Sequence, residues 1–277
     1  SCLSLLLMMS LLMACLAWSV YSLVRDRLGR MPAFMAASIA MLVPLSQTQT
    51  AMVMAEVPLA LFSLWAVVAW SRYLDTPSHG QAIRAALWTT AALMTKGNAW
   101  DIPLAIGLLV LIYRRWDLLL SRTLWMAVAL IAALCIPYYA ATLAITSQGW
   151  DASTFPGVWY TVQSLGIHLR MSAESVGLPM ALLACVGWWM GRREKVWMSM
   201  GIYATAIVLF HGLLPTSIEP RKIYQIVPVL AILVGVAMSW LASLKSARAM
   251  APMLALAGLA IFFVSGYKRE PAFHPGF

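Results

Sequence analysis

The chain has 277 residues, of which 62% are hydrophobic and only 10% are charged. Soluble domains usually carry about 25% charged residues, so this composition excludes an ordinary soluble protein. The net charge of +9 does not indicate nucleic-acid binding, because the basic residues fall in short clusters between apolar runs. Several of these runs approach the roughly 20 residues that cross a bilayer as a helix. We therefore expect an all-α, polytopic transmembrane helical bundle.

The apolar runs predict about ten transmembrane helices separated by polar or charged loops. The expected spans are Leu3–Leu23, Ala33–Leu45, Val57–Tyr73, Ala82–Met94, Trp100–Tyr113, Leu124–Ile145, Leu178–Met190, Trp197–Leu214, Tyr224–Leu241 and Met250–Ser265. We take residues 1–277 as one transmembrane domain. Because Ser1 opens directly into an apolar run and Phe277 follows a polar stretch, we expect a fragment cut at both ends.

The basic residues divide unevenly between two alternating sets of loops. One set holds 13 of the 19 Lys and Arg residues, beginning with Arg25, Arg27 and Arg30. The poorer set holds Lys96, Arg170, Arg221, Lys222, Lys268 and Arg269. By the positive-inside rule the richer set is cytoplasmic, so the poorer set is expected on the outer, periplasmic face of a plasma membrane. We place any active site on that outer face.

A long polar insertion, residues 146–177, falls in the poorer set. Within it Trp159, Val162, Leu165 and Leu169 recur at helical spacing. We expect an outer loop carrying a short amphipathic helix that lies in the membrane interface.

Two charged residues begin and end predicted spans on the outer side. Glu56 precedes Val57-Pro58, where an acidic residue complements the helix dipole or faces an outer cavity as a catalytic carboxylate. Lys96 follows the fourth span and is either a lysine that snorkels to the interface or a point-charge partner for phosphate. Gly97 is expected to end that helix in the left-handed conformation, and Asp101 is expected to line the same pocket.

A third element, Glu219-Pro220-Arg221-Lys222-Ile223-Tyr224, precedes the ninth span. Two adjacent cations at a helix N-terminus favour an anion site over an ordinary solvated loop. We therefore assign Lys96, Arg221 and Lys222 to phosphate binding, and Asp101, Glu219 and Tyr224 to the substrate pocket.

The remaining residues with reactive side chains give weaker signals. His168 and His211 are isolated in the sequence, and we interpret both as packing residues. The cysteines lie inside apolar runs without paired spacing, which indicates neither a metal site nor a disulfide framework.

Three stretches resemble the GT-C superfamily of membrane glycosyltransferases, in particular the relatives of dolichyl-phosphate-mannose protein mannosyltransferases and of the aminoarabinose transferase that modifies lipid A. These stretches are Ala51-Met-Val-Met-Ala-Glu56-Val-Pro58-Leu-Ala-Leu-Phe62, Ala91-Ala-Leu-Met-Thr95-Lys96-Gly97, and Glu219-Pro-Arg221-Lys-Ile-Tyr224-Gln-Ile-Val-Pro228-Val-Leu. Their order and spacing along the chain also fit.

The resemblance implies transfer of a sugar from a polyprenyl-phosphate donor to a lipid, protein or glycan acceptor at the periplasmic face, often with a divalent metal ion nearby. Glu56 would match the acidic residue that begins a span, Lys96 the lysine of the Thr-Lys-Gly turn, and Arg221 the basic residue before the late span. The family's first outer loop, with its principal catalytic aspartate, would lie upstream of Leu3 and outside these residues.

Two other functions compete with the transferase. A secondary transporter would carry ionisable residues at mid-membrane and broken helices, and Pro137 inside the sixth span is the sequence feature in its favour. A polysaccharide ligase or polymerase would have a similar number of spans, but the Thr-Lys-Gly turn and the Arg-Lys-Ile-Tyr pattern favour the transferase.

Overall fold

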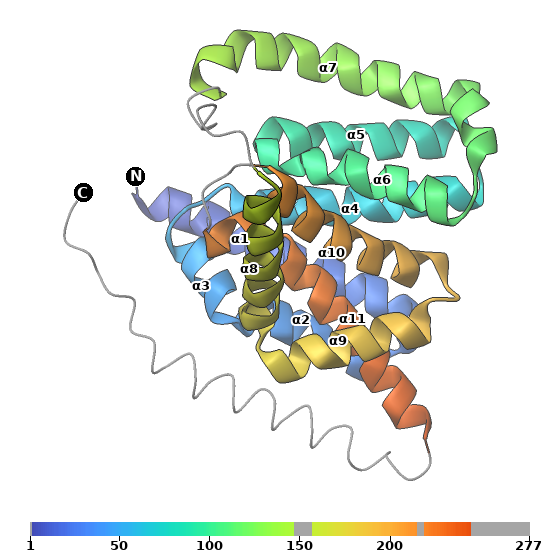
Figure 1. The fold of residues 1–277 in the computed structure, drawn as a ribbon. Coiled ribbons are helices and arrows are strands. Elements are labelled where there is room, and N and C mark those ends of the chain that lie inside the picture. Colours follow the sequence, from blue (N-terminus) through green and yellow to red (C-terminus); the bar gives the residue numbers. More distant parts are fainter. Residues whose placement is uncertain (1, 147–156, 215–218, 245–277) are drawn as a thin grey trace.

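The computed structural model describes residues 2–146, 157–214 and 219–244, and every regular element in these ranges is helical. The long helices run along one another, while α8 crosses one end of the bundle (Figure 1). The first half contains α1 (Cys2–Leu28), α2 (Arg30–Leu42), α3 (Pro44–Ala51), α4 (Glu56–Asp75), α5 (His79–Thr95), α6 (Asp101–Ile112) and α7 (Arg122–Thr146). The second half contains α8 (Val158–Val176), α9 (Leu178–Gly191), α10 (Lys195–Leu213) and α11 (Ile226–Ser243). Short 3-10 helices η1 (Gly97–Trp100), η2 (Trp116–Leu120) and η4 (Pro220–Ile223) connect them.

The helices have the length and composition of a multi-pass membrane protein. Within the described ranges, five single helices are long and apolar enough to cross a bilayer, and the number rises to seven if two bent helix pairs each count as one span. One pair is α2 with α3, bent by 55°, and the other is α8 with α9, bent by 100°. The all-helical membrane fold is thus confirmed, while a count of ten spans stays a prediction. The expected span Met250–Ser265 lies outside the described residues.

Each described span that the sequence predicts coincides with a helix, but two details differ. Pro44 begins a separate helix α3, because proline fits the first turn of a helix and disrupts the interior of one. Pro137, by contrast, lies within the continuous helix α7. The broken span that would favour a transporter is therefore absent from α7.

Helix α8 occupies the insertion between α7 and α9. Its buried residues Ser164, His168 and Ser172 recur every four positions and face the bundle. Trp159 and Leu169, on another face, are 79% and 64% exposed. The helix therefore turns small polar groups and one imidazole toward the protein and leaves large apolar side chains uncovered.

Close helix contact fixes the second half of the bundle. α9 packs along α11, and a Cβ atom added at Gly187 would lie 1.9 Å from the Leu233 carbonyl oxygen. Only glycine leaves the two backbones this close, as small residues do at helix interfaces in membranes. This contact helps to fix α11 and, through it, the η4 segment that precedes α11.

Candidate functional site

An ion pair joins the beginning of α4 to the end of α5. Lys96 Nζ donates a hydrogen bond to Glu56 Oε1, and the Glu56 side chain is only 2% exposed whereas that of Lys96 is 29% exposed. The pair forms because α4 and α5 are antiparallel neighbours, so that the first residue of one helix meets the end of the other. The sequence suggested both residues separately, and the structure shows that each neutralises the other.

The turn that carries Lys96 differs from the expected one. Lys96 itself is extended, with φ −164° and ψ 144°, and Gly97 begins the 3-10 helix η1. The expected left-handed Gly97 is wrong, because the extended lysine already ends α5. This conformation directs the chain into η1, where Asn98 becomes available for a tertiary contact.

The η4 segment contributes two more cations at the same end of the bundle. Arg221 Nε donates to Glu219 Oε2, and its Nη1 lies 3.6 Å from Met54 Sδ, two residues before Glu56. These contacts place η4 against the turn that begins α4.

Lys222 is held next to the Lys96 turn. Asn98 Nδ2 donates to the Lys222 carbonyl oxygen at 3.1 Å, a contact across 124 positions of sequence. Lys222 lies outside the predicted spans, and burial lowers the pKa of its ammonium group below the usual value. The charges of Lys96 and Arg221 lower this pKa further, while Glu219 opposes the shift. The structure therefore brings three cations, Lys96, Arg221 and Lys222, within electrostatic reach of one another.

Two residues that were predicted to line the substrate pocket lie deeper in the bundle than the cation cluster. Tyr224 is 1% exposed, and its hydroxyl donates to Ser46 Oγ at 3.1 Å. Asp101 is fully buried in the first turn of α6, where Tyr203 donates to its Oδ1 at 3.4 Å. Their roles in substrate binding stay predictions. Their positions in the packed interior give them no direct contact with the cation cluster among the interactions described.

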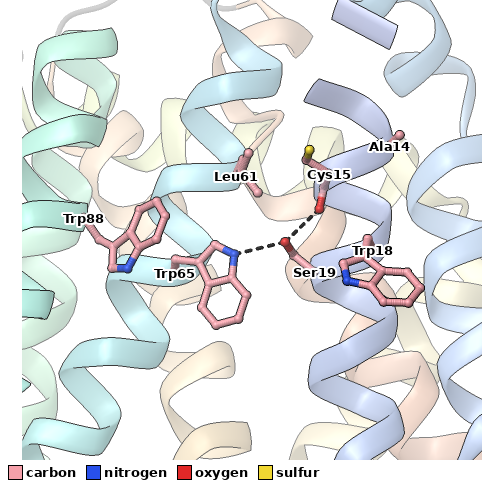
Figure 2. Close-up of a pocket in the computed structure, with 7 residues that line it drawn as sticks. All are labelled: Ala14, Cys15, Trp18, Ser19, Leu61, Trp65 and Trp88. Atoms are coloured by element: carbon pink, nitrogen blue, oxygen red, sulfur yellow. Dashed lines mark hydrogen bonds between the residues drawn. The ribbon is translucent and has the colours of Figure 1, made fainter. Parts of the chain in front are cut away.

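An apolar groove of about 550 Å³ lies farther down the bundle between α1, α4 and α5. Figure 2 shows the residues that line it, which are Ala14, Cys15, Trp18, Ser19, Leu61, Trp65 and Trp88. Trp65 Nε1 donates to Ser19 Oγ at 3.0 Å, and Ser19 in turn donates to the Cys15 carbonyl at 2.7 Å. Because these polar groups satisfy one another, the groove presents an almost wholly apolar surface.

The described residues do not offer a ready metal site. They contain no group of three or more His, Cys, Asp or Glu side chains that could hold a metal ion. The two carboxylates beside the cation cluster, Glu56 and Glu219, are each paired with a cation. A divalent metal expected from the resemblance therefore has no donor set in the part of the chain that the structure covers.

Some of the residues that lie at the end of the bundle with the cation cluster were not predicted from the sequence. Asn98 and Met54 give no local signal, since their contacts join segments that are distant in sequence. His168 and His211 looked isolated, yet their rings stack with centroids 5.6 Å apart. Only the three-dimensional arrangement could have identified this pair.

The fold is similar to that of a known membrane enzyme. The crystal structure of ArnT from Cupriavidus metallidurans bound to undecaprenyl phosphate matches with a TM-score of 0.68 and 21% identity, over 93% of this chain and 49% of that one. The apo structure of the same protein matches with a TM-score of 0.60 and 19% identity, over 93% of this chain and 56% of that one. This chain thus spans about half the length of the solved structures that it matches.

The sequence was also compared with curated proteins and with protein families. No curated protein matches it significantly. The family described as dolichyl-phosphate-mannose-protein mannosyltransferase matches residues 1–141, a little more than half of the chain. Together with the ArnT-like fold, this match confirms the resemblance to GT-C glycosyltransferases. The chain belongs to the dolichyl-phosphate-mannose-protein mannosyltransferase family.

Proposed function

We propose that this chain is the donor-binding part of a membrane glycosyltransferase that uses a polyprenyl-phosphate-linked sugar. The observation that carries the proposal is the convergence of Lys96, Arg221 and Lys222 at one end of the bundle. Glu56 and Glu219 offset two of the three positive charges, so the cluster keeps a net positive charge that an added anion would balance. A lipid phosphate supplies that anion at the membrane surface.

The chemistry of sugar transfer fits such a site. The bond between the anomeric carbon and the phosphate oxygen breaks, an acceptor hydroxyl oxygen bonds to that carbon, and the phosphate leaves with the electron pair. Negative charge therefore grows on the phosphate in the transition state, where preorganised cations lower the barrier. Lys96, Arg221 and Lys222 would supply this stabilisation, while the base that receives the acceptor proton is not assigned among them.

Glu56 would act by positioning Lys96. Its carboxylate engages one ammonium hydrogen, which leaves two of the three N–H groups of Lys96 for an anion. Because Glu56 is almost fully buried and Lys96 is partly exposed, a phosphate at the exposed side of the pair would meet the ammonium group first. This role differs from that of a general base, which would have to reach the acceptor hydroxyl.

The apolar groove supports a lipid-borne donor. Trp65 lies nine residues along α4 from Glu56, and Trp88 lies eight residues along α5 from Lys96. At 1.5 Å per residue, these two tryptophans lie about 12–14 Å below the ion pair along their helices. An isoprenoid chain attached to a phosphate at Lys96 would reach this depth within a few isoprene units.

The charge pattern of the loops favours the periplasmic face of a bacterial inner membrane for this site. The acceptor would then be a lipid, a protein or a glycan that presents a hydroxyl group there. The proposal names the acceptor only by these chemical classes, and it does not specify the sugar.

Binding of undecaprenyl phosphate to the full-length protein in lipid nanodiscs tests the proposal. We expect Lys96→Ala, Arg221→Ala and Lys222→Ala each to weaken binding by about tenfold or more, the loss expected for a charge-assisted hydrogen bond. Arg170→Ala is the matched control, because Arg170 is expected on the same face and is likewise paired with a carboxylate, Glu174, but its side chain is 80% exposed on α8. Unchanged binding in all three variants, or uptake of a solute without any transfer product, would contradict the transferase.

A further inference from the structure

A pair of stacked histidines lies beside the cation cluster. His168 on α8 and His211 on α10 are both fully buried, their ring centroids are 5.6 Å apart, and their planes are inclined by only 20°. Ser164 Oγ donates to the His211 carbonyl at 3.3 Å, so the same turn of α8 also holds the end of α10. The pair therefore occupies a fixed position between the crossing helix and the bundle.

The hydrogen bonds of the pair are incomplete. His168 Nδ1 lies 2.8 Å from the Ser164 carbonyl oxygen, which can only accept, so this nitrogen carries the hydrogen. No described residue makes a hydrogen bond of good geometry with His168 Nε2 or with either ring nitrogen of His211, although the Lys222 backbone lies near the His211 ring. With both rings neutral, the pair offers two lone pairs and one N–H group that are unused.

Buried polar atoms without a hydrogen-bond partner require an explanation. Each buried donor or acceptor without a partner costs about 1–3 kcal/mol, so proteins retain few of them. The other unpartnered buried atoms of the described residues occur singly, whereas three gather here on two adjacent rings, and this concentration points to partners that come from a ligand. Hydroxyl groups complement it, because each hydroxyl both donates and accepts.

The charged groups near the histidine pair further restrict the chemical class of the ligand. The ammonium groups of Lys96 and Lys222 are close enough to act electrostatically on His211. Two positive charges disfavour a metal cation between the imidazoles, whereas they leave a neutral polyhydroxyl group unaffected. A sugar bonded to a phosphate at these lysines would lie next to that phosphate, in the neighbourhood of His211.

We propose that His168 and His211 bind hydroxyl groups of the donor's sugar and so help to select it. This inference rests on the proposed function, because the lysines must hold the phosphate for the sugar to reach the pair. The ring nitrogens are covered in this structure, and Leu165 packs closely against Gly212 beside them. The proposal therefore requires the side chains between α8 and α10 to move apart, so that the sugar hydroxyls can reach the three unused atoms.

Two probes separate sugar binding from phosphate binding. One is undecaprenyl phosphate, and the other is the same lipid phosphate carrying mannose or glucose, each measured with the full-length protein in nanodiscs. We expect at least one sugar-bearing lipid to bind the wild type more tightly than the bare lipid phosphate does. His168→Gln and His211→Gln should weaken that lipid by about tenfold and change the binding of the bare lipid phosphate less than twofold.

Control variants distinguish a sugar subsite from a purely structural histidine pair. His79→Gln, at the exposed beginning of α5, should leave both affinities unchanged. Equal loss of both lipids in the histidine variants would assign the pair a structural role, and failure of every sugar to improve wild-type binding would also overturn the proposal. If the bare lipid phosphate does not bind the wild type, the proposed function itself fails. If His211→Gln does not fold, His168→Asn alone carries the same comparison.

A metal ion is the remaining occupant to exclude. Zinc alone, titrated into the wild type, should bind no more tightly than it binds to His168→Gln. Tight binding that either substitution removes would replace the sugar subsite with a metal site and overturn the proposal.

Discussion

The carboxylate of Glu56 receives a hydrogen bond from the ammonium group of Lys96 although 40 positions separate them. One partner is almost wholly removed from solvent and the other is partly accessible. An intact pair of this kind adds little to the free energy of unfolding. Removal of one partner lowers this free energy much more, because the other charge is then buried and uncompensated. Stability and ligand binding can therefore be separated at this site.

A double-mutant cycle at Glu56 and Lys96 should show this separation. Lys96→Ala should lower the free energy of unfolding by about 1–3 kcal/mol, and Glu56→Gln added to it should recover most of that loss. Binding of undecaprenyl phosphate should remain weak in the double variant, because the cation is still missing. Thermal unfolding in detergent and lipid binding check the two quantities, and recovery of both together would contradict a direct contact between Lys96 and phosphate.

Lys222 should give a pH-dependent stability. Its pKa is lower in the folded protein than in the unfolded chain, chiefly because of burial. Between these two values the unfolded chain binds more protons, so stability should rise with pH up to about 10.5, the ordinary value for lysine. Lys222→Met should flatten this rise in unfolding experiments on the alkaline side below pH 10.5, since it removes the titrating group.

The same shift predicts the pH dependence of lipid binding. An ammonium group with a lowered pKa loses its proton at a lower pH, so affinity for the lipid phosphate should fall before pH 10.5 in the wild type. Lys222→Arg, which keeps its charge in this range, should move the decline to higher pH. A decline that is identical in wild type and Lys222→Arg would exclude Lys222 from the phosphate site.

Gly187→Ala should destabilise the bundle. The added Cβ would lie 1.9 Å from the Leu233 carbonyl oxygen, so α9 and α11 would have to separate. We expect a loss of about 1–3 kcal/mol, the usual range for overpacking. Gly166→Ala on α8 is the control, because an added Cβ there meets nothing within 4 Å and should stabilise the helix by about 0.5–1 kcal/mol. Thermal melting of the two variants in the same detergent measures the difference.

Trp88→Ala should affect long lipids more than short ones. The tryptophan lines the groove and stacks with Trp65 at a centroid distance of 6.2 Å. Loss of its apolar area should weaken binding of undecaprenyl phosphate severalfold, while a lipid phosphate of two isoprene units ends near the Lys96 pair and should be unaffected. Trp125→Ala, an exposed tryptophan on α7, provides the comparison. Equal effects on both lipids would place the isoprenoid chain elsewhere.

The sequence predicted the helices better than it predicted their contacts. Apolar runs of bilayer length identified α1, α4, α7, α10 and α11, because each helix satisfies its backbone hydrogen bonds within its own segment. The residues that begin and end helices, Glu56 and Lys96, were also found from local signals.

The partners of these residues could not be found in the same way. The bonds of Lys96 to Glu56 and of Asn98 to the Lys222 carbonyl depend on helix packing, which a single sequence does not specify. The stacked imidazoles of His168 and His211 are 43 positions apart and meet because α8 packs against α10. Local patterns thus gave the charged groups, and tertiary structure decided which of them meet.

The hydrogen bond from Asn98 to Lys222 crosses the boundary of the matched family region, which ends at residue 141. Lys96 and Glu56 lie inside that region, whereas Arg221 and Lys222 lie beyond it. A relative truncated after α7 would keep the region that matches the family but would lose two of the three cations. We therefore expect such a protein to match the family and yet to bind lipid phosphate weakly. For this architecture, the family signature lies in the first half of the chain, whereas the proposed phosphate site would draw its cations from both halves.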